Sequence, residues 1–237
     1  MVLRKINEAW GDGAGLDVLA VGYATPFVDG LAARASRLVA AMPAAQGVEA
    51  WPAGLANRAC LVDETALPLP NALFDRVLAV HALEESDSPL AVLEEIRRVM
   101  APSGRVIIAV AARHGFWANA ESTPFGHGRP FSRRQLEGLV REAELSPLGW
   151  TRALYAPPLA WAGRWAEGFE QAGALLWPPF AGLILLEAVK QTFAITPRAH
   201  GAKVPARTRP ALAPAGATRA RTAARPQDRS ADPASRR

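Results

Sequence analysis

The sequence predicts an α/β fold in which a doubly wound, mostly parallel β-sheet carries helices on both faces. Short apolar runs without polar alternation recur along the chain, separated by segments with helical spacing, as expected for parallel strands covered on both sides. The first run ends in the turn Gly22–Thr25, followed by Pro26. Strand, tight turn and helix start is the order that opens many nucleotide-binding α/β domains. The runs predicted as parallel strands are residues 17–21, 37–42, 59–62, 76–80 and 105–111.

Charge is distributed unevenly along the chain. Ten of the 27 Lys and Arg lie in residues 197–237, where only Asp228 and Asp232 oppose them, so this segment carries +8 and residues 1–196 carry −3. The segment is rich in Ala, Pro and Arg and poor in large apolar side chains, so we expect a disordered basic tail after one α/β domain. Weak, salt-sensitive contact of this tail with anionic surfaces or nucleic acid is the partner that its charge predicts.

Cysteine content and hydropathy favour a cytoplasmic protein without a membrane span. Cys60 is the only cysteine, which excludes an intrachain disulfide. The first ten residues lack the apolar core of a signal peptide. The longest uncharged run, residues 172–186, is shorter than the roughly 20 residues of a spanning helix and contains two prolines. The cysteine and the four histidines show no metal-ligand spacing, so no metal is predicted.

The first half of the chain predicts short connections. Residues 1–15 read as a lead-in helix or loop. Thr25 suits an N-cap and Pro26 the first turn of a helix over Phe27–Ala35. Residues 46–57 contain Gly, Pro and Trp and are read as irregular.

The next helix is predicted to begin at Ser88 and Pro89, which suit the N-cap and the first helical position. Apolar side chains at helical spacing give it one face directed at a core. These side chains are Leu90, Leu93, Ile96 and Met100.

In the second half, Ser132 and Gln135 have the spacing of a capping box at the start of a helix. Residues 148–155 are then read as a strand and residues 159–172 as a helix. Residues 180–189 are read as a last strand, with a helix as the alternative because of their Leu and Ala content. The tryptophans between residues 150 and 177 predict core or dimer contacts, so a homodimer is a partner that we expect.

The segment from Asp63 to Val110 carries the most specific pattern in the chain. It reads as an acid, A-L-P, F-D before an apolar run, His81, a helix, and R-R-V-M-A-P-S-G before the next strand. In order and spacing it resembles the class I S-adenosylmethionine-dependent methyltransferases, particularly the small bacterial ones. The element order resembles that family from Leu16 to Lys190. Segments around Gly22, Gln46 and Gly128 also resemble an alphaproteobacterial branch of it.

The resemblance implies a Rossmann-like methyltransferase sheet, S-adenosylmethionine as cofactor, and methyl transfer to an acceptor that the sequence does not identify. The family's cofactor loop reads apolar, apolar, acid, apolar, Gly-x-Gly-x-Gly. Here Ala20 stands at the acid position, and Gly22, Ala24 and Pro26 stand at the three glycine positions. Met42 stands where the family has the acid that holds the ribose hydroxyls, and a thioether is a weak acceptor.

Other cofactor contacts follow from the same resemblance. Asp63, next to Glu64, matches the acid that meets the adenine amino group. As residues alone, Asp63 reads equally as a solvated loop acid and Gly22 as an ordinary turn. Tyr23 either fills the cofactor space or stacks on the cofactor. The predicted cofactor-binding residues are therefore Gly22, Tyr23, Ala24, Met42, Asp63 and Glu64.

Substrate contacts are expected in the connection 112–131, whose length of about 20 residues is typical of functional loops. Arg113, Trp117 and Arg129 are predicted to line a pocket for a small-molecule substrate, since arginine suits a carboxylate or phosphate. His127 in this loop, and His81 at the end of the fourth strand, are the candidate bases. The alternatives are a structural lid for the loop and a packing role for His81.

Three functions are compatible with these features. The first is a methyltransferase, whose main task would be to place a nucleophile near the methyl group. The second is a non-catalytic binding or regulatory protein on the same fold, which the residues at positions 20 and 42 suggest. The third is an interaction protein whose basic tail contacts nucleic acid.

Overall fold

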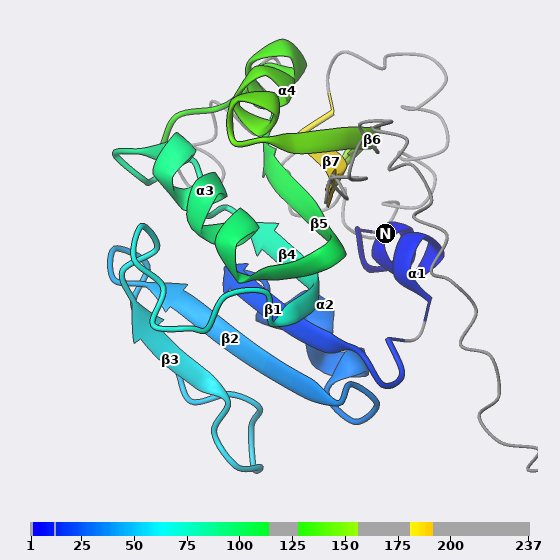
Figure 1. Ribbon diagram of the computed structural model, residues 1–237, viewed down its shortest axis with the longest axis vertical. Coiled ribbons are helices and arrows are strands. Elements are labelled where there is room, and N and C mark those ends of the chain that lie inside the picture. Colours follow the sequence, from blue (N-terminus) through cyan, green and yellow to red (C-terminus); the bar gives the residue numbers. More distant parts are fainter. Residues whose placement is uncertain (1, 12, 114–127, 156–180, 192–237) are drawn as a thin grey trace, which may run out of the picture. The chain divides into compact units, whose positions relative to one another are not determined.

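The computed structural model of the 237-residue chain describes residues 2–11, 13–113, 128–155 and 181–191. Within them, seven strands form one sheet in the order β3-β2-β1-β4-β5-β7-β6 (Figure 1). β7 is antiparallel to both neighbours, and the remaining neighbours are parallel. The predicted doubly wound, mostly parallel sheet is confirmed. The strands are β1 (Asp17–Gly22), β2 (Arg37–Pro43), β3 (Ala59–Val62), β4 (Phe74–Val80), β5 (Met100–Ala111), β6 (Leu145–Ala153) and β7 (Leu183–Lys190).

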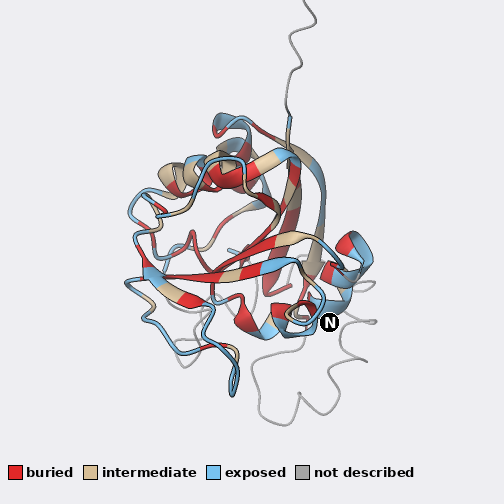
Figure 2. Ribbon diagram, turned by 60° about the horizontal axis from the view of Figure 1, so that its bottom comes forward, coloured by how far each residue is buried: buried red, intermediate tan, exposed pale blue. Residues whose placement is uncertain are grey.

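Each face of the sheet has its own apolar core, and the buried residues follow the strands and the inward sides of the helices (Figure 2). On one face, α3 (Pro89–Val99) and α4 (Arg133–Glu142) pack on alternate strand residues such as Val21 and Ile108. On the other face, α1 (Val2–Trp10) and α2 (Thr25–Val28) pack on the strand residues that alternate with the first set, such as Val18 and Ala20. We call the apolar residues of this face the second core. Helices on both faces were predicted.

The predicted helix over Phe27–Ala35 is wrong in extent. The chain forms only the four-residue α2 and a single 3-10 turn, η1 (Asp29–Leu31). Backbone bonds to residues three back, from Ala32 to Asp29 and from Arg34 to Leu31, tighten the chain there. The Asp29 carboxylate also accepts a bond of 2.6 Å from the indole of Trp51. Thr25 is not the N-cap either, because that position is Ala24.

The connection from β2 to β3 is irregular, as predicted. Trp51 is 6% exposed and fills the second core in place of a covering helix. The Asn57 carboxamide oxygen accepts from the backbone N–H groups of Trp51 and Ala59, which fixes the return of the chain to β3. This connection therefore lies against the domain and brings residues 46–49 to the edge at which β1 and β2 end.

Two predicted helix starts and the last two predicted strands are present in the structure. Ser132 and Gln135 form the predicted capping box at α4. Ser88 is the N-cap of α3, but its side chain makes no capping bond. The strand predicted at 148–155 is β6, which begins and ends earlier, and residues 183–190 are strand, so the helical alternative there is wrong. The helix predicted at 159–172 lies outside the described residues.

By its residue contacts the chain divides into Met1–Ala194 and Ile195–Arg237. The basic tail predicted from residue 197 lies outside the described residues, so its disorder stays a prediction. Among the helices that are described, none has the length and hydropathy needed to cross a membrane.

Candidate functional site

The carboxyl ends of the parallel strands line one edge of the sheet, where ligands bind in open α/β folds. The turn after β1 lies at that edge. Gly22 has a φ of 73°, and a Cβ there would overlap the carbonyl oxygen of Val80 and lie 3.2 Å from the Cβ of Ala82. The next residue, Tyr23, donates its backbone N–H to Val80 at 2.9 Å. Only glycine fits this turn without displacing the end of β4.

A pocket of about 290 Å³ opens beside this turn, close to the lower bound of about 300 Å³ for ligand sites. Tyr23 is 58% exposed and forms part of the wall. The polar lining is supplied by Thr25, Gln46 and Glu49. The full lining consists of Gly22, Tyr23, Thr25, Met42, Gln46, Gly47, Val48 and Glu49.

The backbone at Ala24 and Pro26 accommodates an alanine and a proline side chain without strain. Ala24 has a φ of −98° and is completely buried, so its methyl group causes no backbone strain. Pro26 lies in the first turn of α2, where its missing N–H costs no helical bond. Because α2 has only four residues, its backbone offers little helix dipole to an anion.

Ala20 and Met42, which the sequence resemblance places at two acid positions of the family, are both buried. Ala20 is 1% exposed and packs in the second core. Met42 is 6% exposed at the end of β2, and its sulfur accepts the backbone N–H of Glu49 at 3.4 Å. Glu49 is the one carboxylate of the pocket lining.

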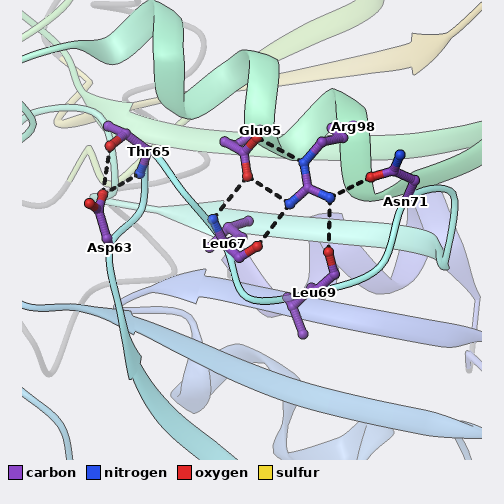
Figure 3. A network of polar contacts seen from close by, with 7 residues as sticks. All are labelled: Asp63, Thr65, Leu67, Leu69, Asn71, Glu95 and Arg98. Carbon is purple, nitrogen blue, oxygen red and sulfur yellow. Dashed lines mark hydrogen bonds and ion pairs between the residues drawn. The ribbon is translucent and has the colours of Figure 1, made fainter.

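Asp63 follows β3 and is exposed, with its carboxylate held in a local turn (Figure 3). Oδ1 accepts from the Thr65 hydroxyl at 2.6 Å and from the Thr65 backbone N–H at 2.8 Å. The hydroxyl bond first, and then the backbone bond, lowers the pKa of Asp63 below its ordinary value. Glu64 is half-buried next to it. Neither side chain lines the pocket between β1 and β2.

The loop after Asp63 is fastened to α3 by an ion pair (Figure 3). Glu95 accepts from the backbone N–H of Leu67 at 2.9 Å and pairs with Arg98 at 2.8 Å. The Arg98 guanidinium also donates to the carbonyls of Leu67 and Leu69 and to the Asn71 side chain. The bonds from Arg98 are the main reason that the pKa of Glu95 is lowered.

His81 follows β4 and is held from several directions. Its φ is 52°, an uncommon conformation for a residue with a side chain. The backbone N–H donates to Ala109 at 3.0 Å, and the carbonyl accepts from Gln46 at 2.6 Å. Its ring Nδ1 lies 2.8 Å from Oε1 of Glu84. Gln46 thereby links His81 to the lining of the pocket.

Glu84 belongs to this site but was not predicted. Its run of sequence, Glu84 to Ser88, is polar and looks like a surface turn, although Glu84 is only 3% exposed. The one available signal was a carboxylate three residues after a candidate base. Oε1 accepts the backbone N–H of Ala111 at 2.7 Å in addition to the contact with His81.

Arg113 and Arg129 come together with Glu84 at the end of β5. Arg129 donates its backbone N–H to the Glu84 carbonyl at 2.9 Å. The preceding Gly128 has a φ of 84°, and a Cβ there would lie 2.7 Å from the same oxygen. Arg113 is exposed, and its guanidinium lies 3.4 Å from the Pro130 carbonyl. The predicted substrate residues Arg113 and Arg129 therefore lie on neighbouring backbone segments.

The other loop candidates, Trp117 and His127, lie outside the described residues. Among the residues that are described, no group of His, Cys, Asp and Glu has the geometry of a metal site. Cys60 is half-buried, and this burial raises the pKa of its thiol, as for an inert small side chain.

A comparison with protein families bears directly on this edge of the sheet. Residues 19–108, which run from β1 into β5, match a family model described as "Methyltransferase domain". Residues 19–108 therefore form a methyltransferase domain. The family uses S-adenosylmethionine as its methyl donor. The matched residues include the turn at Gly22, the end of β2, Asp63 and His81.

Solved structures share the fold of this methyltransferase domain. An S-adenosylmethionine-dependent methyltransferase from Archaeoglobus fulgidus has a TM-score of 0.58 at 15% identity, covering 80% of this chain and 93% of its own. Another from Mesorhizobium loti has a TM-score of 0.55 at 12% identity, covering 79% and 95%. The [4+2]-cyclase SpnF has a TM-score of 0.56 at 20% identity, covering 81% and 80%. No curated protein matches the chain.

The predictions of the fold and of a methyltransferase domain are confirmed by these findings, whereas the alphaproteobacterial branch stays a prediction. The methyl acceptor is not identified. At these identities the solved structures show the fold alone, and the cyclase illustrates that this fold also carries other activities.

Proposed function

We propose that the protein binds S-adenosylmethionine at the carboxyl ends of β1 and β2 and transfers its methyl group to a small-molecule acceptor. The observation that carries the proposal is the pocket around Gly22, which lies inside the matched methyltransferase domain. When bound, S-adenosylmethionine supplies a methyl group on a sulfonium sulfur, which leaves as a neutral thioether with the electron pair of the broken bond.

The residues of this edge fit such a group. The left-handed Gly22 turn lets backbone approach a ligand closely. Tyr23 offers an exposed ring, and Ala24 lies at the base of the turn. Met42 faces the same pocket, where Glu49 provides a carboxylate for hydroxyl groups. Next to β3, Asp63 and Glu64 are assigned to the adenine end of the cofactor.

The acceptor side is assigned to the ends of β4 and β5. His81 is the proposed base, and Arg113 and Arg129 are proposed to hold an anionic group of the substrate. Trp117 and His127 stay candidates of the same pocket, although they lie outside the described residues. We further propose a cytoplasmic protein with a domain over residues 1–196 and a disordered basic tail over 197–237.

The residues at positions 20 and 42 support a second candidate function. Ala20 and Met42 are buried and apolar, and by the sequence resemblance they replace two acids that would contact the cofactor. A protein that has lost cofactor binding, and that acts as a binding or regulatory module on this fold, would show the same replacements.

Titration calorimetry of the full chain with S-adenosylmethionine and S-adenosylhomocysteine separates the two candidates. A methyltransferase is expected to give saturable heat with one ligand per chain for both compounds. No heat at millimolar ligand would overturn the proposed methyltransferase activity and leave the regulatory module as the function of this fold.

A further inference from the structure

The side chain of Gln46 joins the segments that follow β2 and β4. Its Nε2 donates to the backbone carbonyl of His81 at 2.6 Å. In the sheet, β1 lies between β2 and β4, so this bond reaches past the strand end that carries Gly22. Neighbouring strands lie about 5 Å apart, so the ends of β2 and β4 are roughly 10 Å from each other. One side chain therefore connects the pocket that it lines with the acceptor side.

Backbone bonds hold Gln46 directly after β2. Its N–H donates to the Pro43 carbonyl at 3.0 Å, and the N–H of Gly47 donates to the same oxygen at 3.2 Å. Gly47 has a φ of 80°, a left-handed conformation that glycine adopts without strain. Since Pro43 is the last residue of β2, the sheet fixes the point from which the Gln46 side chain starts.

The His81 carbonyl determines how the Gln46 amide is oriented. A carbonyl oxygen only accepts hydrogen bonds, so the amide nitrogen faces His81 and the amide oxygen does not. Within the described part of the chain, no protein donor meets Oε1. Glu49 is the charged residue of the same pocket lining, which contains neither Lys nor Arg. Such a wall suits ligand hydroxyl or ammonium groups better than a phosphate.

The backbone of His81 depends on the bond from Gln46. A φ of 52° costs free energy in a residue with a side chain, and such conformations persist only where surrounding contacts impose them. The N–H of His81 donates to Ala109 at 3.0 Å, so β5 holds one backbone polar group and Gln46 holds the other. A ligand that fixes the Gln46 amide therefore also favours the left-handed backbone at residue 81.

We propose that Gln46 couples the cofactor pocket to the acceptor side. Its Oε1 accepts a hydrogen bond from a hydroxyl or ammonium group of S-adenosylmethionine, while Nε2 holds the carbonyl of His81. The inference rests on the proposed function, because S-adenosylmethionine is the ligand assigned to this pocket. Cofactor binding orders the amide and strengthens its bond to His81, and by linkage that bond raises the affinity of the pocket. Gln46 acts through His81 and is a positioning residue.

The carbonyl carbon of His81 provides a direct readout. In the ¹³C,¹⁵N-labelled full chain its shift is detected through the N–H of Ala82 and responds to the hydrogen bond on that carbonyl. Titration of the wild type with S-adenosylhomocysteine should move it along the same binding curve as the N–H of Gly47. The Val80 carbonyl is the internal reference, since it accepts from Tyr23 without involving Gln46.

Gln46→Met removes the donor and the acceptor at similar size, and Gln191→Met is the matched control because Gln191 is exposed after β7. In Gln46→Met, the His81 carbonyl should stop responding to the ligand while the Val80 carbonyl still responds. Calorimetry should give an affinity about three- to tenfold lower, as for one neutral hydrogen bond, and no change in Gln191→Met. Gln46→Glu, which cannot donate when ionised, should also abolish the His81 response.

The outcomes separate this inference from the proposed function. A His81 carbonyl that still responds in Gln46→Met, or that is silent in a wild type with saturable binding, would overturn the coupling and leave the proposed function intact. Wild-type affinity in Gln46→Met would overturn the contact between Oε1 and the ligand. Absence of binding by the wild type at millimolar ligand would overturn the proposed function and the coupling together.

Discussion

The carbonyl oxygen of Val80 occupies the space that a side chain on Gly22 would need. The two residues are the last of β1 and β4, which are neighbours in the sheet. The turn of the candidate cofactor pocket is thus built against the strand end that leads into His81. Any change at Gly22 acts on the pocket and on the acceptor side together.

Replacement of Gly22 by Ala should disturb this turn. A Cβ at a φ of 73° is strained and overlaps Val80, so we expect a loss of stability on the order of 1–3 kcal/mol and at least a tenfold loss of affinity for S-adenosylmethionine. Thermal unfolding and calorimetry measure the two effects. Gly30→Ala is the control, since its Cβ would meet nothing within 4 Å. Equal affinities of both variants would contradict the assigned pocket.

Asp63 provides a test of the assigned adenine end. Asp63→Ala should weaken binding of S-adenosylmethionine about fivefold or more, because a charged acceptor for an amino group is lost. The exposed Asp87, after β4, provides Asp87→Ala as a charge-matched control with unchanged affinity. If calorimetry gives the same affinity for Asp63→Ala as for the wild type, Asp63 is a solvated loop acid.

The Glu95–Arg98 pair should make stability depend on pH. The bonds from Arg98 lower the pKa of Glu95 below its ordinary value of 4.5, so the stabilisation is complete above that pH and is lost as the pH falls further. Arg98→Ala should lower the free energy of unfolding by about 2 kcal/mol at pH 7 and flatten this acid dependence. Urea unfolding between about pH 3 and about pH 7, roughly the range in which carboxylates titrate, measures the loss of stability and its dependence on acid.

Arg4→Ala is a suitable control for that experiment. Arg4 pairs with Glu8 on α1 with both side chains about two-thirds exposed, so its removal should change stability by less than about 0.5 kcal/mol. An equal loss of stability in Arg98→Ala and Arg4→Ala would show that the Glu95–Arg98 pair makes no specific contribution to holding the loop after Asp63.

The two serine caps should differ in their contribution to stability. Ser132 accepts the backbone N–H of Gln135, so Ser132→Ala should cost about 1 kcal/mol in the free energy of unfolding. Ser88 makes no such bond, and Ser88→Ala should be close to neutral. Chemical denaturation of both variants decides the matter, and a larger loss for Ser88→Ala would be incompatible with the observed caps.

Sequence patterns predicted the parallel strands well because each is a short apolar run whose neighbours are fixed by the crossover rules. They failed at Phe27–Ala35, where the apolar spacing of a helix is present but a tertiary bond between Trp51 and Asp29 and a tight 3-10 turn determine the backbone. Local propensity contains no information on such a contact.

The candidate site was predictable in part for the same reason. Gly22 ends β1 and His81 directly follows β4, so their place on one edge follows from topology. Glu84 was not predictable, because its burial depends on Ala111 and Arg129, which are far from it in sequence. The pocket wall formed by Gln46 and Glu49 likewise depends on the path of an irregular connection.

The central claim is the position of S-adenosylmethionine at the ends of β1 and β2. Backbone amide shifts of the ¹⁵N-labelled full chain, measured during titration with S-adenosylhomocysteine, test it most directly. The largest shifts are predicted at Gly22, Tyr23, Gly47 and Glu49, with Thr151 unchanged because it lines a different pocket. Shifts that cluster around Thr151, or no shifts at millimolar ligand, would contradict the account.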